Sequence, residues 1–300
     1  MNKILIITGP TASGKSDLAI QMAEKYNGEI VSADAMQIYR KLNVGTAKVT
    51  VSEQKKVPHH LIDIVDMTAQ FSVAEFLEKA DEVVLDIISR GKLPIMVGGT
   101  GFYVKAFIGE ATLDFVASNS DEVKLLNKEP IDTLVAQLKQ LDNDLAHRVD
   151  LKNKQRVVRA IQIARHGKHS DIQKRPDYDS LIIAIDWERE LLYQRINSRV
   201  YNMIDNGLID EAKLILEAGG ETIQAGKAIG YKELFPYLEH NMSLETSISQ
   251  IQQDSRRYAK RQLTYLRHQI PGLVWIDGYH AKAVLSNKIN NWLNKKTHVN

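Results

Sequence analysis

Residues 9–16 read GPTASGKS and directly follow the apolar run KILIIT at residues 3–8. The pattern G-x-x-x-x-G-K-[ST] is typical of a loop that surrounds phosphate with backbone N–H groups, between a buried strand and the first turn of a helix. The two glycines allow the backbone conformations that such a loop needs, while Lys15 supplies a positive charge and Ser16 a hydroxyl for a magnesium ion. The loop predicts a diphosphate or triphosphate site and leaves open what that phosphate is attached to.

Short apolar runs recur along the chain and alternate with helical patterns. Further strands are expected at residues 29–34, 93–99, 180–186 and 272–277. Strands that alternate with helices predict an α/β fold with a central parallel sheet flanked by helices.

The strand pattern is absent between residues 112 and 178, where the sequence is polar and has helical spacing. We therefore expect an inserted, all-helical subdomain at 112–178, within a core formed by residues 1–111 and 179–300.

Composition narrows the possible functions. The chain has 300 residues, a formal net charge of +2 and no cysteine. Without cysteine there can be no disulfide, thiolate zinc site, iron–sulfur cluster or cysteine nucleophile. The apolar run at the N-terminus is too short to span a bilayer, so we expect a cytoplasmic protein without a membrane partner.

Two further loops follow predicted strands and carry polar residues. In a parallel sheet, ligands bind beyond the carboxyl ends of the strands, so Asp34 and Thr100 are candidates for the phosphate site. Asp34 could bind magnesium, act as a general base or cap a helix, and Thr100 could lie near a leaving group or in a plain turn. The adjacent His59 and His60 point apart in any regular element and are interpreted as loop or packing residues. We expect no metal site built from protein ligands alone.

Positive charge is concentrated in residues 152–175 and 255–270. In the second segment Arg257, Arg261 and His268 share a helical face, beside Tyr258 and Tyr265. A basic face with aromatic residues suits the phosphates and splayed bases of single-stranded RNA. Composition alone favours this interpretation no more than a solvated helix balanced by acids elsewhere.

The combination of sequence blocks resembles the bacterial tRNA dimethylallyltransferases, from residue 3 to about residue 277. The blocks that carry the resemblance, in order, are GPTASGKS, VSADAMQIYRKLNVGTAK, PHHLIDI, FSVAEF, PIMVGGTGFYVKA, KQRVVRAIQI, AIGYKE and RRYAKRQLTYLRH.

The resemblance implies a P-loop NTPase-like core in which the loop, which looks like an ATP-binding site, holds dimethylallyl diphosphate. The implied reaction transfers the dimethylallyl group to the exocyclic amine of the adenine 3′ to the anticodon, in tRNAs that read codons beginning with U. Diphosphate leaves with Mg2+ assisting, and the implied partners are the tRNA anticodon stem-loop and dimethylallyl diphosphate. We expect a monomer.

The resemblance also implies roles for individual residues. Asp34 would be the general base, Thr100 would lie near the reacting centre, and Lys15 and Arg199 would stabilise the diphosphate, with Ser16 holding Mg2+. Diphosphate binding is expected at Gly9, Thr11, Ala12, Ser13, Gly14, Lys15 and Ser16. Contacts to tRNA are expected from Asp34, Ala35, Met36, Gln37, Thr100, Gln155, Arg156, Val157, Val158, Arg159, Arg257 and Arg261.

Three other functions remain open on the sequence. A P-loop small-molecule kinase would use the same loop and Asp34, but would leave the basic helices unexplained. Prenyl transfer to free AMP would keep the donor and change the acceptor. An ATP-dependent RNA-binding switch would need no transfer chemistry.

Overall fold

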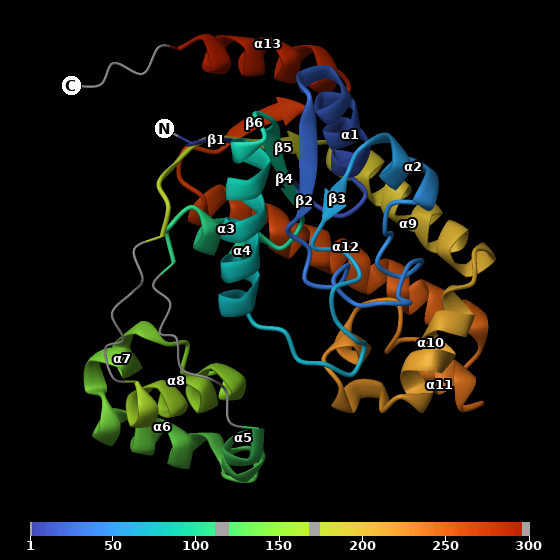
Figure 1. Cartoon of the computed structure of the whole chain (residues 1–300). Coiled ribbons are helices and arrows are strands. Elements are labelled where there is room, and N and C mark those ends of the chain that lie inside the picture. Colours follow the sequence, from blue (N-terminus) through green and yellow to red (C-terminus); the bar gives the residue numbers. More distant parts are fainter. Residues whose placement is uncertain (1, 112–119, 168–174, 296–300) are drawn as a thin grey trace. The chain divides into compact units, whose positions relative to one another are not determined.

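The computed structural model describes residues 2–111, 120–167 and 175–295. The chain divides into two compact units, one formed by Met1–Ala111 with Pro176–Asn300 and the other by Thr112–Arg175 (Figure 1). The sequence placed the second boundary at residue 178, where strand β5 already begins.

The first unit is built on one six-stranded sheet with the strand order β3-β2-β4-β1-β5-β6. Every neighbouring pair is parallel, which confirms the predicted α/β fold. The strands are β1 (Asn2–Thr8), β2 (Gly28–Ser32), β3 (His59–His60), β4 (Leu93–Gly98), β5 (Tyr178–Asp186) and β6 (Val274–Asp277).

Strand β1 lies inside the sheet, and its residues Ile4 to Ile7 are fully buried. A run of apolar residues rather than an alternating pattern is expected of a parallel strand covered on both faces. Leu5 and Ile7 pack with helices α1 (Lys15–Tyr26) and α13 (Ala281–Asn294) in one core. Helix α3 (Val73–Ser89) covers the opposite face, and α4 (Gly101–Phe107) packs on it, with Phe76 stacked on Tyr103 at 4.2 Å between ring centroids.

Strand β3 differs from the sequence-based expectation. His59 and His60 pair with Ile30 and Val31 as a two-residue strand at the edge of the sheet, rather than lying in a loop. A strand of two residues has no periodicity, so the sequence pattern could not reveal it.

Helices dominate the rest of the first unit after β5. Helix α12 (Leu244–Gln269) runs beside α9 (Arg189–Asp205) and contacts α4. No helix within the described ranges is long and apolar enough to cross a membrane. The remaining helices of this unit are α2 (Val51–Lys56), α9 (Arg189–Asp205), α10 (Leu208–Glu217), η1 (Gly220–Thr222), η2 (Ala225–Lys227) and α11 (Phe235–Leu238).

The second unit contains helices joined by short turns, and no strand among the residues that the structure describes. Its helices are α5 (Ser120–Leu126), α6 (Ile131–Leu141), α7 (Asn143–Arg148) and α8 (Lys154–His166). Leu134 and Leu138 of α6 pack against Val157 and Ile161 of α8, so this unit has a core of its own.

Candidate active site

The phosphate loop joins β1 to α1 and is held in shape from outside. Gly14 has φ 84° at the N-cap of α1, and Gly9 has φ 147°, so both take conformations that favour glycine. Trp187 donates its indole N–H to the carbonyl of Ser13 at 2.9 Å, and Arg195 Nε donates to the carbonyl of Ala12 at 2.8 Å. These bonds hold two of the loop's carbonyl groups, one from the connection between β5 and α9 (Arg189–Asp205) and one from α9 itself.

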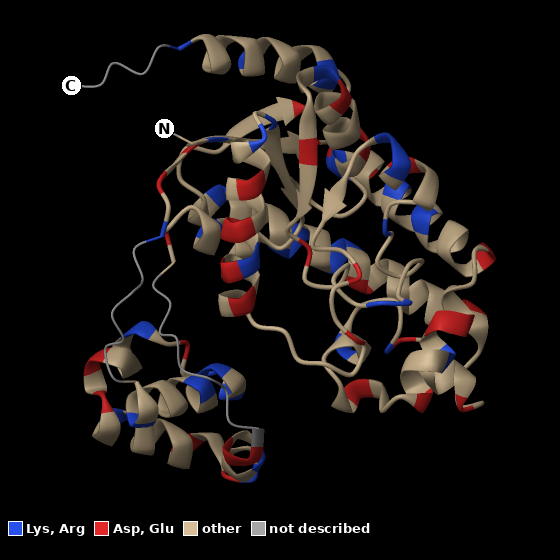
Figure 2. Cartoon of the chain, in the orientation of Figure 1, with Lys and Arg blue, Asp and Glu red and all other residues tan. Residues whose placement is uncertain are grey.

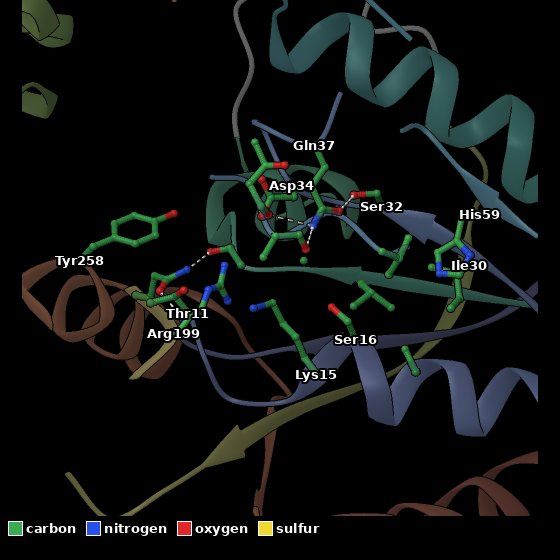
Figure 3. Close-up of a pocket in the computed structure, with 18 residues that line it drawn as sticks. Thr11, Lys15, Ser16, Ile30, Ser32, Asp34, Gln37, His59, Arg199 and Tyr258 are labelled. Carbon is green, nitrogen blue, oxygen red and sulfur yellow. Dashed lines mark hydrogen bonds between the residues drawn. The ribbon is translucent and has the colours of Figure 1, made fainter. Parts of the chain in front are cut away.

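A cavity of about 80 Å³ lies next to this loop. Thr11, Lys15, Ser16 and Arg199 line it together with Asp34, as Figure 3 shows. Apolar side chains of Ala19, Ile30, Val49 and Val97 also line it, so one cavity offers both cationic and apolar walls.

Two cations share this cavity. Burial and the nearby positive charge of Arg199 lower the pKa of Lys15 to about 8, although Asp34 acts in the opposite direction. Burial also lowers the pKa of Arg199, against the attraction of Asp34. Because both positive charges are disfavoured here, an anion bound between them would be strongly favoured.

His59 lines the same cavity, a role that sequence reasoning missed. Its Nδ1 lies 2.7 Å from the carbonyl oxygen of Val57, and burial lowers the pKa of its imidazole. The short strand β3 brings it there, and no motif in the sequence signals that strand.

Gln262 of α12 connects two loops of the site. Its side-chain oxygen accepts the N–H of Thr11 at 2.9 Å, and its Nε2 donates to the carbonyl of Gly99 at 2.8 Å. A Cβ on Gly99 would lie 2.5 Å from Gln262 Nε2, and one on Gly101 would lie 2.6 Å from the Tyr265 ring. The glycines of the GGTG stretch therefore let α12 approach the end of β4.

Asp34 and Thr100 meet at the carboxyl ends of β2 and β4. Thr100 Oγ1 accepts the N–H of Ala35 at 3.1 Å, and Asp34 Oδ1 accepts the N–H of Met36 at 2.9 Å. The bond to the residue two positions on forms a turn rather than a helix cap. Thr100 precedes α4 without capping it, because its hydroxyl bonds to the other loop.

A second cavity, of about 420 Å³, adjoins the first and is of a size that suits a small organic group such as a nucleobase. The two share the lining residues Thr11, Asp34, Thr46, Arg199 and Tyr258. Ala35, Met36, Thr100 and Arg261 line the second cavity, whereas Gln37 lines the first. Asp34 therefore lies where an anion-binding cavity meets a larger one.

The site offers oxygen ligands that suit magnesium. Among the described residues no group of three or more His, Asp or Glu could hold a metal ion. Mg2+ is commonly bound by one or two protein oxygens, with water and substrate phosphates completing its shell. The Ser16 hydroxyl and the Asp34 carboxylate in one cavity fit that ligand preference.

The remaining candidates lie outside the two cavities. Gly9, Ala12, Ser13 and Gly14 shape the phosphate loop but line neither cavity. Arg257 is exposed on α12 and forms an ion pair with Asp254 at 3.2 Å.

The basic segment of the inserted unit is only partly available to a ligand. On α8, Gln155 and Arg156 are exposed and Arg159 is half-buried. Val157 and Val158 were predicted to contact tRNA, but their side chains pack in the core of this unit. Arg148, Arg156 and Arg159 line a groove on its surface, and Figure 2 shows acidic residues on the same unit. Lys168, Asp171 and Lys174 of the basic segment lie outside the described residues.

Comparison with known proteins gives one consistent result. A family model described as IPP transferase matches residues 37–269. The tRNA dimethylallyltransferase of Leuconostoc citreum is 62% identical to this chain, with 98% of the chain and 100% of that protein covered. The corresponding protein of Leuconostoc mesenteroides is 63% identical, over 99% of this chain and 100% of its own length.

Solved structures agree with the sequence comparisons. The full-length tRNA isopentenylpyrophosphate transferase of Bacillus halodurans superposes with a TM-score of 0.75 at 38% identity, over 98% of both chains. A eukaryotic dimethylallyltransferase that acts on tRNA superposes with a TM-score of 0.84 at 26% identity, over 100% of this chain and 81% of its own.

Proposed function

The chain belongs to the IPP transferase family, and on that premise we propose that it transfers a dimethylallyl group from dimethylallyl diphosphate to tRNA. The acceptor in this proposal is the exocyclic amine of the adenine 3′ to the anticodon, in tRNAs that read codons beginning with U. The observation that best supports it is Asp34, which lies at the junction of a cationic cavity and a larger one.

The cationic cavity suits the donor. Breaking the allylic C–O bond leaves its electron pair on the departing diphosphate and positive charge on the allyl group. Lys15, Arg199 and the N–H groups of the phosphate loop would stabilise the negative charge that develops on the diphosphate. The apolar walls of the same cavity would exclude water, which would otherwise react with the allyl cation.

The acceptor needs a base. The adenine amine attacks the allyl carbon, forms a C–N bond and must then lose one proton. We assign that proton to the Asp34 carboxylate, a contribution of about 10²–10⁴-fold to the rate. The Thr100 hydroxyl, which holds the adjacent Ala35 N–H, would keep the Asp34 loop in place.

Magnesium fits this proposal as a cofactor. When bound, Mg2+ neutralises part of the charge on the diphosphate. Ser16 would hold it through its hydroxyl, alongside oxygens of the substrate diphosphate.

Recognition of tRNA would draw on the basic residues of both units. The target adenine must leave the stack of the anticodon loop, at a cost of a few kcal/mol. Phosphate contacts from Arg156, Arg159, Arg257 and Arg261 would offset that cost. We place this reaction in the cytoplasm and assign it to a monomer.

The test of the proposal is the mass of the RNA product. Purified protein, Mg2+ and an unmodified anticodon stem-loop with adenines 3′ of the anticodon are incubated with dimethylallyl diphosphate or with ATP. We expect the RNA to gain one C5H8 unit with the first donor only. ATP turnover without any gain in RNA mass would instead favour a kinase or an RNA-binding switch, and modification of free AMP would identify a different acceptor.

Asp34→Asn tests the base. The asparagine keeps an oxygen that can accept the Met36 N–H, so the turn should persist while the proton acceptor is lost. The single-turnover transfer rate should fall about 10²–10⁴-fold with RNA affinity unchanged. An unchanged rate would remove Asp34 from that role.

A further inference from the structure

A loop that borders both cavities is held by a carboxylate that the proposed reaction does not use. The loop comprises residues 43–48 (NVGTAK). Thr46 lines both cavities, Gly45 lines the larger one and Ala47 lines the cationic one. Any displacement of this loop would therefore change both cavities together.

Glu211 of α10 binds the first three residues of this loop. Its Oε1 accepts the N–H groups of Asn43 at 2.6 Å and Val44 at 2.7 Å. Its Oε2 accepts the N–H of Gly45 at 3.0 Å and the hydroxyl of Tyr231, also at 3.0 Å. Successive N–H groups that converge on one anion form a strong and well-directed site for it.

Tyr231 completes this arrangement and gives a role to the AIGYKE block at residues 228–233. Its side chain is fully buried, and its ring packs on the loop at Gly45. A Cβ on Gly45 would lie 2.5 Å from the Tyr231 ring, so only glycine fits there without movement. The NVGTAK and AIGYKE blocks thus meet on the Glu211 side chain.

Other bonds hold the far end of the loop within the N-terminal half of the chain. Gln37 Nε2 donates to the carbonyls of Thr46 and Ala47, both at 3.3 Å. Lys48 Nζ donates to the carbonyl of Tyr39 at 2.8 Å. Glu211 connects the first residues of the loop, Asn43 to Gly45, to α10, which belongs to the C-terminal half of the chain.

We propose that Glu211 is a positioning residue, which holds the 43–48 loop so that the two cavities meet correctly beside Asp34. Glu211 itself lines neither cavity, so it acts through the loop and not on a substrate. The inference rests on the proposed transfer of a group between molecules bound in these two cavities. A small shift of reacting groups is enough to lower a rate about 100-fold.

Glu211→Gln is the main variant for the test. A glutamine can keep one acceptor oxygen, but its NH2 group must then face N–H or O–H donors, so part of the loop has to move. Ile215→Val on the same helix is the matched control, because Ile215 is fully buried and its truncation is mildly destabilising without touching these bonds. All variants are assayed at a temperature at which they are folded.

Two measurements are made on each protein. Hydrogen–deuterium exchange reports protection of the amides of residues 43–45, and a single-turnover assay reports the rate of transfer to the stem-loop. In Glu211→Gln we expect faster exchange at these amides and at least a tenfold lower rate, with both values near parental in Ile215→Val. Faster exchange with a rate equal to that of the control would overturn the proposal, and so would unchanged exchange.

Tyr231→Phe keeps the test decisive if Glu211→Gln does not fold. It removes one of four bonds to the carboxylate and keeps the ring against Gly45, so we expect a smaller loss of rate, of several-fold. A parental rate in Tyr231→Phe together with faster exchange at residues 43–45 would again contradict the role. A parent protein that transfers nothing would refute the proposed function, whereas the exchange data would still show whether Glu211 holds the loop.

Discussion

The substitution Gln262→Leu removes the hydrogen bonds by which Gln262 connects two loops of the site and keeps a side chain of similar volume. Leucine has a similar size but can neither accept the N–H of Thr11 nor donate to the carbonyl of Gly99. Gln262 is 7% exposed, so the substitution acts inside the protein.

The expected loss of stability is moderate, because neither partner is left without an alternative. The carbonyl of Gly99 also accepts the N–H of Gly101 at 3.1 Å, and the N–H of Thr11 lies at a cavity where water can replace the lost acceptor. Two ordinary hydrogen bonds of about 0.5–1.5 kcal/mol each give a loss of about 1–3 kcal/mol. For a unit of this size, that corresponds to a fall in Tm of roughly 2–12 °C.

The expected loss of activity is larger than the loss of stability suggests. Gln262 links the phosphate loop to the loop of Thr100, so its loss should let the donor site and Asp34 move relative to one another. A displacement of about 1 Å can lower the rate about 100-fold. Single-turnover transfer and thermal unfolding are measured on Gln262→Leu and on Gln269→Leu, an exposed residue of the same helix.

The control fixes the interpretation. Gln269→Leu should leave both values near parental, since exposed substitutions change stability by about 0.5 kcal/mol or less. A Gln262→Leu protein that melts at a lower temperature but transfers as fast as the Gln269→Leu protein would refute the reasoning.

Two further predictions concern Lys15 and the close contact of Gly98. Because the pKa of Lys15 is lowered to about 8, its ammonium is present below that pH and is lost above it, so donor affinity should fall as pH rises through 8. Titration calorimetry with dimethylallyl diphosphate from pH 7 to about pH 9.5 should show this fall in affinity for the parent protein and an affinity independent of pH for Lys15→Ala. The same dependence of affinity on pH in both proteins would contradict the prediction. A Cβ on Gly98 would lie 2.0 Å from the carbonyl oxygen of Ala33. That backbone cannot move away easily, because the N–H of Ala33 donates to the carbonyl of Val97. Gly98→Ala should therefore abolish the folded protein. Gly91→Ala is the control, because its Cβ would meet no atom within 4 Å. Its positive φ should lower the stability by only about 1–2 kcal/mol. Equal soluble yield and equal Tm for the two variants would count against the argument.

Sequence reasoning found five of the six strands of the sheet and missed only β3, because the central strands are continuous apolar runs. The run at residues 3–8 became β1 at Asn2–Thr8, and the run at 93–99 became β4 at Leu93–Gly98. Such runs occur where both faces of a strand are covered.

The contacts that assemble the site were not readable from local patterns. Gln262 meets Thr11 across 251 residues, and Glu211 meets Asn43 across 168 residues. Gln262 lies on the buried face of α12 between Ala259 and Leu266. A polar residue among apolar ones on that face is the one feature of the sequence that could have indicated a buried hydrogen bond there. Periodicity indicates which face is buried, but it does not indicate what that face meets.

The order of strands in the sheet has a consequence for biosynthesis. Strand β1 pairs with β4 on one side and with β5 on the other, and Leu5 lies beside Ile95 and Leu181. The ribosome must make roughly 80 residues between Gly98 and Tyr178, which takes about 4–16 s at about 5–20 residues per second. During that interval one edge of an apolar strand has no partner, and such edges pair readily with other chains. The nascent chain therefore passes through a stage at which the edge of β1 that later pairs with β5 is open to pairing with another chain.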